Sequence, residues 1–436
     1  ATANAIVISS DALIYGGLVD SRTHQLPQDI LTSRAERLLN LKSLGGDPLV
    51  YVFTTIMRSP KASSAPVEPA YYAEWGPKLF RMGVLEDKLD LKEISRKERK
   101  ELSGLKVEIP RAVQEDRARR RSLNIATTEL LLHGVESGNF DYLLIGRDDT
   151  APYSQAHKEA RKMDILVREL PKEKIRFFSG ADQLGLLLLS RAASRVSYEI
   201  PMVYVDFAEG KGGETIPAYE DDEIAFSAAE HIHAAGGWPT ANLARADLVL
   251  AVNTPFDGVT VEASNPKNTG TITEHTEKFV ADVKRYLKQG KAVAVADIAY
   301  GNGADNALVR KLFEEEVAEK LAAYGGWNTA GNTLGFALGQ GLLSKSMDTD
   351  LQSLLEIRYL DDWAYQANVR NKTYVELIWP NYWPNSGLNT QQVQEAEAVI
   401  TKDILEIAEP VLGAKVSSYN FTLPWKRMFE VEVSKK

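Results

Sequence analysis

The sequence predicts an α/β fold built on parallel β-strands. Short apolar runs alternate with helical stretches along most of the 436 residues, which is the pattern of repeated strand–helix–strand units. The runs are apolar at nearly every position, as expected of strands whose two faces are both covered. We favour a (β/α)8 TIM-like barrel with a small inserted α/β unit and a C-terminal helical cap. The alternative is a doubly wound parallel sheet.

The predicted elements follow one another in a regular order. Each strand is a short apolar run, and the stretches with helical periodicity lie between these runs. We expect strands at 5–9, 49–54, 142–146, 175–179, 202–207, 248–253, 292–297 and 321–325. We expect helices at 28–44, 116–137, 156–170, 182–194, 272–289 and 306–323.

Changes of composition suggest how these elements divide into domains. We expect residues 1–200 to form the first part of a catalytic α/β domain and 256–345 to form its remainder. Residues 201–255 are expected to be an inserted α/β unit. Residues 346–436 are rich in Trp and Tyr with prolines between them, and we expect them to form a C-terminal cap.

A charge-dense segment, residues 71–121, has helical periodicity and no predicted strand. It contains a run of basic residues, Arg117 to Arg121, that taken alone resembles a nucleic-acid-binding patch. Glu115 and Asp116 directly precede the run, so we expect a solvated helix face instead. A lid over the site is a second interpretation of this segment.

Composition excludes several classes of function. The net charge of -9 disfavours partners that are nucleic acids or anionic membranes. The absence of cysteine excludes disulfides, thiolate catalysis and cysteine metal sites. No apolar stretch approaches the roughly 18 residues of a membrane span. Neither the dinucleotide-binding nor the P-loop fingerprint is present, and the six histidines are scattered. We therefore expect no cofactor and no metal.

Two adjacent aspartates follow one of the predicted strands. The run Tyr142–Gly146 leads directly into Arg147, Asp148 and Asp149. Like charges this close do not both ionise freely, so we expect the pKa of one carboxyl group to be raised. A proton donor beside a charged partner suits acid–base chemistry, although an aspartate here also suits a helix cap. We take Asp148 and Asp149 as candidate catalytic residues.

Polar residues follow nearly every other predicted strand as well. The carboxyl ends of parallel strands share one edge, and ligand sites form there. Aromatic residues near these ends suit sugars, whose C–H faces pack on rings while the hydroxyl groups pair with polar side chains. The candidate substrate-binding residues are Asp11, Tyr15, Arg58, Arg147, Tyr153, Asp182, Asp297, Tyr300, Asn302, Trp327, Asn328 and Asn332.

Six blocks of the sequence, in order and spacing, resemble a bacterial family known as a domain of unknown function. The blocks are residues 10–22, 55–58, 147–153, 180–182, 251–255 and 326–333. Members of that family usually begin with a further strand that ends in Pro-Leu-Asp-x-Arg-Pro. The resemblance therefore implies that a segment carrying one more site aspartate precedes residue 1.

A second resemblance concerns mechanism. If the absent leading strand is counted, Asp148 and Asp149 end the fourth barrel strand, which is similar to retaining N-acetylhexosaminidases that use substrate assistance. That resemblance implies that Asp148 orients the 2-acetamido group and that Asp149 protonates the leaving oxygen and then activates water. It implies an acetamido pocket walled by Tyr300, Trp327 and Asn328, and sugar hydroxyl groups held by Arg58, Asp11 and Asp182.

We therefore expect a glycoside hydrolase, an exo-N-acetylhexosaminidase whose substrate carries GalNAc or GlcNAc. No nucleic-acid partner and no membrane span are expected, and assembly into a homo-oligomer is left open. One alternative is a metal-dependent hydrolase with Asp11, Asp148, Asp149 and Asp297 as oxygen ligands. The other is a carbohydrate-binding protein without catalytic activity.

Overall fold

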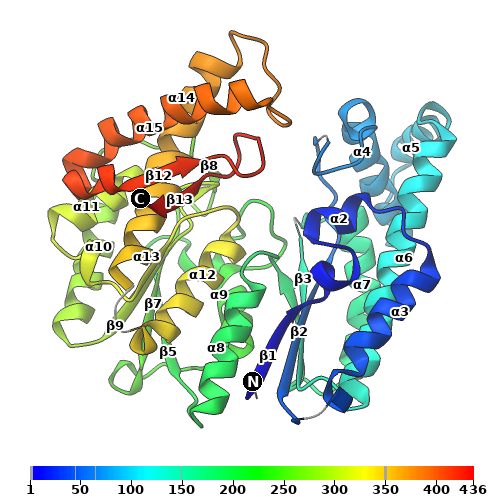
Figure 1. Ribbon diagram of the computed structural model, residues 1–436, viewed down its shortest axis with the longest axis horizontal. Helices are drawn as coiled ribbons and strands as arrows, with labels where there is room; N and C mark the ends of the chain where they lie inside the picture. The colour runs from blue at the N-terminus through cyan, green and yellow to red at the C-terminus, as the bar shows by residue number, and fades with distance from the viewer. Residues whose placement is uncertain (1–2, 45, 64, 149, 348–350) are drawn as a thin grey trace. The chain divides into compact units, whose positions relative to one another are not determined.

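The structure is a computed structural model that describes residues 3–44, 46–63, 65–148, 150–347 and 351–436. The chain divides into two compact units (Figure 1). Unit 1 comprises Ala1–Ala192 and Tyr219–Asp221, and unit 2 comprises Ala193–Ala218 and Asp222–Lys436. Each unit contains its own parallel sheet and its own apolar core.

The sheet of unit 1 has four parallel strands in sequence order. They are β1 (Ala5–Ser9), β2 (Leu49–Ile56), β3 (Tyr142–Arg147) and β4 (Ile175–Ser179). The carboxyl ends of all four strands therefore lie along one edge of this sheet. The helices of the unit are α1 (Ser10–Ile14), α2 (Leu18–Thr23), α3 (Gln28–Leu39), η1 (Leu41–Leu44), α4 (Tyr72–Asp90), α5 (Arg96–Glu108), α6 (Arg111–Glu136), α7 (Gln155–Arg168) and α8 (Leu184–Val196), which continues into unit 2.

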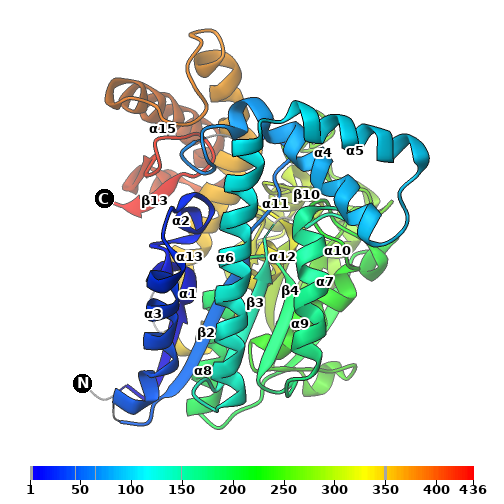
Figure 2. The same ribbon diagram turned by 90° about the vertical axis from the view of Figure 1, so that its right-hand side faces the viewer.

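Three helices, α3, α6 and α7, pack on this sheet (Figure 2). Leu31 of α3, Leu131 of α6 and Met163 of α7 are almost completely buried in the same cluster as the strand residues Val52 and Leu143. Burial of such side chains from water is the main stabilising contribution to this layer.

Helices α4 and α5 form a second, smaller layer of unit 1. Their own apolar cluster includes Leu79 and Leu102. Helix α5 begins with a capping box, in which the Ser95 hydroxyl accepts a hydrogen bond from the Glu98 amide and the Glu98 carboxylate accepts one from the Ser95 amide.

The sheet of unit 2 has five parallel strands in the order β11-β9-β7-β5-β6. They are β5 (Met202–Phe207), β6 (Trp238–Pro239), β7 (Leu248–Asn253), β9 (Ala292–Asp297) and β11 (Ala323–Gly325). The chain steps outward from β5 to β6 and then crosses back through β7, β9 and β11. This reversal between β5 and β7 is the topological switch point of a doubly wound sheet.

The other elements of unit 2 are mostly helical. They are η2 (Gly212–Glu214), α9 (Ile224–Ala234), η3 (Leu243–Arg245), α10 (Glu274–Lys288), α11 (Asn306–Glu314), η4 (Ala318–Lys320), α12 (Ala330–Leu343), η5 (Ser344–Ser346), α13 (Leu351–Arg358), the π-helical turns η6 (Tyr359–Val369), α14 (Arg370–Thr373), the π-helical turns η7 (Tyr374–Ile378), α15 (Thr390–Leu412) and η8 (Ala414–Ser418). Two short strands, β8 (Val261–Glu262) and β10 (Tyr300–Gly301), pair in parallel, and β12 (Tyr419–Thr422) pairs antiparallel with β13 (Glu432–Lys435).

The C-terminal helices, coloured orange to red in Figure 1, belong to the core of unit 2. Leu360 and Ile400 are fully buried in the same cluster as Val280 of α10 and Val309 of α11. Side chains from the expected C-terminal cap therefore contribute to the core of unit 2.

The α/β class with parallel strands is confirmed, but the barrel is not. The described strands form two main open sheets and two two-stranded ones, and the expected alternative, a doubly wound sheet, fits the main sheet of unit 2. The segments 202–207 and 248–253, expected in an inserted unit, are strands β5 and β7 of the five-stranded sheet. A barrel and an open sheet share the same alternation of strands and helices along the sequence. The two folds differ in the order in which the strands pair, which this alternation does not reveal.

Two further expectations need correction. The helix expected over 306–323 ends at Glu314, and the segment after it turns back to enter β11. The basic run on α6 is only in part a solvated face, because Arg119 is exposed whereas Arg117, Arg120 and Arg121 are 7%, 2% and 3% exposed. Within the described parts of the chain, no helix combines the length and the hydropathy that crossing a membrane requires.

Candidate functional site

Asp148 is held at the carboxyl edge of the four-stranded sheet by a buried ion pair. Its amide donates to the carbonyl oxygen of Ile56, so the residue continues the pairing of β3 with β2. One Asp148 carboxylate oxygen lies 2.7 Å from Nη2 of Arg22 on α2, and both side chains are buried. Asp149, the second member of the predicted pair, lies outside the described residues.

Asp11 lies close to this ion pair. It stands in the first turn of α1, which the Ser9 side chain caps directly after β1. Its carboxyl group accepts a hydrogen bond of 2.6 Å from the Thr55 hydroxyl. Burial, with a further contribution from the charge of Asp148, raises the pKa of Asp11 to about 7. The Asp11 carboxyl group therefore titrates near neutral pH.

A second acid, Glu68, connects two arginines of the same edge. Its carboxylate lies 2.8 Å from Nε of Arg58 and 3.9 Å from Nη1 of Arg22. Arg22 thus lies between two carboxylates, Asp148 and Glu68. We refer to Asp11, Arg22, Thr55, Arg58, Glu68 and Asp148 as the β1–β3 cluster.

Arg147 points away from Asp148, as alternation along a strand requires. Its guanidinium donates to Asp221 at 2.9 Å and to the Ser179 hydroxyl, at the end of β4, at 3.0 Å. Tyr219, in the same short segment as Asp221, accepts hydrogen bonds from the amide and hydroxyl groups of Thr150. Hydrogen bonds therefore hold the segment 219–221 against the end of β3.

Three other predicted residues of unit 1 lie near this edge with different contacts. The ring of Tyr15 lies 5.0 Å from that of His24, and the charge of Asp11 contributes to a raised Tyr15 pKa that is mainly due to burial. Tyr153 instead donates to Glu93 in the segment after α4. Asp182 is exposed in the turn after β4.

The predicted residues of unit 2 gather at the ends of β9 and β11. Asp297, completely buried at the end of β9, accepts hydrogen bonds from the side chains of Asn253 and Tyr324 and from the amide of Asp305. Asn253 also donates to the Asp305 carboxylate at 3.3 Å. Burial and mutual repulsion raise the pKa of Asp297, and burial raises that of Asp305. The two acids titrate as a pair.

The loops that follow β9 and β11 touch each other. The amide of Asn302 donates to the carbonyl oxygen of Asn328, and both residues have positive φ, +59° and +64°. Such backbone is uncommon for residues other than glycine and recurs at functional sites. Trp327 packs near Phe336 and Phe429, Tyr300 donates to the carbonyl oxygen of Lys267, and Asn332 is buried in the first turn of α12.

Sequence reasoning missed a second adjacent pair, Asp361 and Asp362, within the π-helical turns η6. Asp362 accepts a hydrogen bond from the Gly326 amide and forms an ion pair with Arg358, and burial raises its pKa to about 7. The Asp-Asp signal was the same as at 148–149, but no apolar strand precedes it. Arg22 lies within a block that carries the family resemblance, whereas Glu68 has no comparable signal.

The candidate residues therefore fall into two sets, one in each unit. Asp11, Tyr15, Arg58, Arg147, Asp148, Tyr153 and Asp182 belong to unit 1, whereas Asp297, Tyr300, Asn302, Trp327, Asn328 and Asn332 belong to unit 2. Among the described residues, no three His, Asp or Glu side chains are grouped so that they could hold a metal ion.

Comparison with known families confirms the resemblance to a domain of unknown function. The sequence model of a family described as Protein of unknown function (DUF4127) matches residues 1–434. The chain belongs to this family. No curated protein and no solved structure matches the chain. The description of the family states no activity.

Proposed function

We propose that this protein is a glycoside hydrolase that performs acid–base chemistry at the β1–β3 cluster. The observation that carries the proposal is the contrast between two neighbouring acids, Asp11 and Asp148. Asp11 has a pKa of about 7, whereas Asp148 is paired with the Arg22 guanidinium. A carboxyl group that keeps its proton near neutral pH, beside a carboxylate held in an ion pair, is an arrangement that suits acid catalysis.

The substrate that we propose is an N-acetylhexosaminide, GalNAc or GlcNAc, cleaved with retention and with substrate assistance. In this proposal Asp148 orients the 2-acetamido group, whose oxygen attacks the anomeric carbon, and a second acid protonates the leaving oxygen. Asp149 is the proton donor that the sequence suggests, and Asp11 is the donor that its raised pKa suggests. The family to which the chain belongs adds no support for a particular substrate.

A screen of nitrophenyl glycosides, run with and without a chelator, tests the reaction class. We expect hydrolysis of nitrophenyl N-acetylhexosaminides, no hydrolysis of plain hexosides, and no effect of the chelator, because the acetamido group itself is the nucleophile. Activity that disappears with the chelator would instead favour the metal-dependent alternative. Tight sugar binding without turnover would favour the carbohydrate-binding alternative.

Leaving-group dependence identifies the proton donor. An aryl leaving group needs little protonation. Replacing the donor should therefore reduce kcat far less on an aryl glycoside than on a natural glycoside. On the natural glycoside we expect kcat to fall about 100-fold or more. Asp149→Asn and Asp11→Asn are compared with Asp29→Asn, which changes an exposed acid on α3. Equal losses on both substrates would argue that the altered residue is not the donor.

The pH profile provides a second criterion for the same choice. If Asp11 is the donor, kcat/KM on a natural glycoside falls as the pH rises through about 7, because the carboxyl group then loses its proton. Asp11→Asn should remove that limb of the profile. A limb that persists unchanged in Asp11→Asn assigns it to another group.

A further inference from the structure

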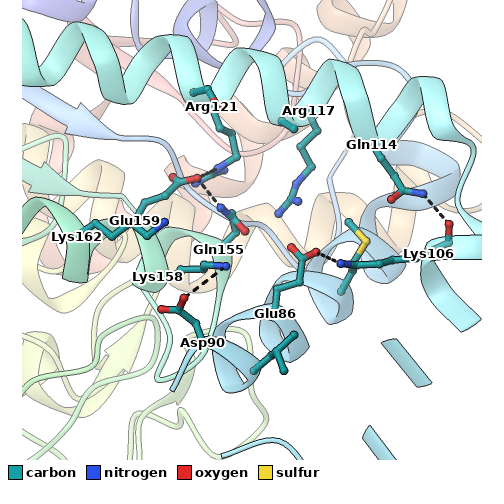
Figure 3. A pocket seen from close by; sticks show the side chains of 14 residues that line it. Glu86, Asp90, Lys106, Gln114, Arg117, Arg121, Gln155, Lys158, Glu159 and Lys162 are labelled. Carbon is teal, nitrogen blue, oxygen red and sulfur yellow. Dashed lines mark hydrogen bonds and ion pairs between the residues drawn. The ribbon is translucent and has the colours of Figure 1, made fainter. Parts of the chain in front are cut away.

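The basic run on α6 forms part of a cavity in unit 1. Four helices, α4, α5, α6 and α7, enclose a volume of about 580 Å³ (Figure 3). This is within the range of small-molecule sites, which is about 300–1,000 Å³. Its charged lining residues are Glu86, Asp90, Lys106, Arg117, Arg121, Lys158, Glu159 and Lys162.

The three buried arginines of the basic run differ in their partners. Arg120 forms two hydrogen bonds to Asp116, at 2.9 and 2.8 Å, and one to the carbonyl oxygen of His24. Arg121 lies 2.7 and 2.6 Å from the two carboxylate oxygens of Glu159 and donates to the carbonyl oxygens of Met57 and Arg58. Both positive charges are compensated within the protein.

Arg117 has no such partner. It is 7% exposed, yet no hydrogen bond or ion pair joins its guanidinium to any residue in the part of the chain that the structure describes. Figure 3 shows the side chain extending into the cavity between Gln155 and Glu86, while the neighbouring acids are engaged elsewhere. Glu86 pairs with Lys106 at 2.8 Å, and Glu159 with Arg121. A cation removed from water without an anion is costly to the folded state.

The net charge of the residues that line the cavity is positive, like that of Arg117. Five cationic side chains and three acidic ones line it, which leaves an excess of two positive charges. The cations without an acidic partner among the described residues are Arg117, inside the cavity, and Lys162, which is exposed. A guanidinium binds a phosphate or carboxylate group through paired N–H donors.

We propose that this cavity binds a small organic dianion, a phosphate monoester or a dicarboxylate, with Arg117 as its principal anchor and Lys162 as a second contact. The site is separate from the β1–β3 cluster and does not depend on the proposed glycosidase activity. Burial of Arg117 excludes a nucleic-acid backbone as the ligand, because a polymer strand requires an open basic surface.

Titration calorimetry with three probes at constant ionic strength tests the proposal. Glycerol 3-phosphate and inorganic phosphate represent phosphates, and succinate represents dicarboxylates. We expect saturable binding of at least one probe, weakened about tenfold or more in Arg117→Met and by a smaller factor in Lys162→Gln. Arg99→Met, which removes an exposed arginine from α5, should bind as the unaltered protein does.

Thermal unfolding without any probe separates binding from a structural role. Because Arg117 has no partner to lose among the described residues, Arg117→Met should unfold at the same temperature as the unaltered protein or at a higher one. The proposal fails if no probe binds, if Arg117→Met or Lys162→Gln retains full affinity for the probe that binds, or if Arg117→Met lowers the unfolding temperature.

Discussion

At the scale of single residues, burial determines which charged groups can act. Asp11 is 3% exposed, Arg22 is 6% exposed and Asp148 is 8% exposed. Removing ions from water in this way is tolerated only when each charge is neutralised by a proton or by a partner. Asp11 retains its proton up to about pH 7, and Asp148 has Arg22.

The Arg22–Asp148 ion pair gives a test at this scale. Arg22→Met should lower the free energy of unfolding by about 3–5 kcal/mol, because it leaves the Asp148 carboxylate buried without a cation. Urea denaturation followed by circular dichroism measures the loss. The double variant Arg22→Met/Asp148→Asn should recover much of it, since neither charge then remains.

An exposed ion pair provides the matched control. Arg111 and Glu115 form a similar contact at 2.6 Å on α6, but their side chains are 90% and 61% exposed. Arg111→Met should therefore change the free energy of unfolding by less than about 1 kcal/mol. A loss in Arg22→Met as small as this one would contradict the assignment of Arg22 as the counter-ion of a buried carboxylate.

At the scale of elements, close packing of β3 against β4 fixes the position of the Asp148 segment. Gly146 precedes Arg147, and a Cβ atom at Gly146 would lie 2.3 Å from the carbonyl oxygen of Gly180 and 2.6 Å from Leu184. The backbone oxygen of Gly180 cannot move aside to make room for this Cβ atom, as the end of a flexible side chain could. The glycine in the strand is therefore required by the backbone that follows β4, at the edge that carries the cluster.

Gly146→Ala should destabilise the protein by about 2 kcal/mol or more, because the added methyl group has no space. It should also lower any activity of the β1–β3 cluster by displacing β3 and Asp148. The midpoint of urea denaturation measures the first effect. Gly104→Ala is the control, since Gly104 lies in α5 with nothing within 4 Å of the new Cβ atom. That substitution should stabilise by up to about 1 kcal/mol.

At the scale of the whole molecule, several buried acids link folding to pH. The pKa values of Asp11 and Asp362 are about 7, and that of Asp297 is raised as well, mainly because of burial in each case. The ordinary pKa of an aspartic acid side chain in water is 3.8. The folded state therefore binds more protons than the unfolded state between about pH 4 and 7, and the stability from these groups is lost as pH rises through 7.

Unfolding near pH 5.5 should accordingly release up to about three protons from these groups. Calorimetric unfolding in buffers of different ionisation enthalpy measures the number released. Asp11→Asn should reduce it by about one and should make stability less dependent on pH between 5 and 8. Asp29→Asn serves as the control. An unchanged proton release in Asp11→Asn would contradict the raised pKa of Asp11.

The sequence by itself determined the local elements. The apolar runs at 5–9, 175–179, 202–207, 248–253 and 292–297 are strands with those same limits, because a strand buried on both faces needs continuous apolar residues whatever its neighbours are. It also placed polar residues at the strand ends, and Asp11 and Asp148 do lie close together.

The tertiary structure alone decided how the strands assemble and which charges are buried. Strand order depends on contacts between residues far apart in the chain, so the same alternation that predicts a barrel also forms two main open sheets. Likewise, the charge pattern predicted a solvated face for the basic run on α6, whereas the folded unit buries Arg117, Arg120 and Arg121. Asp116 is four residues before Arg120 on the same helix, but the pairing of Arg121 with Glu159 of α7 and the position of Arg117 in the cavity become apparent only when the helices are placed side by side.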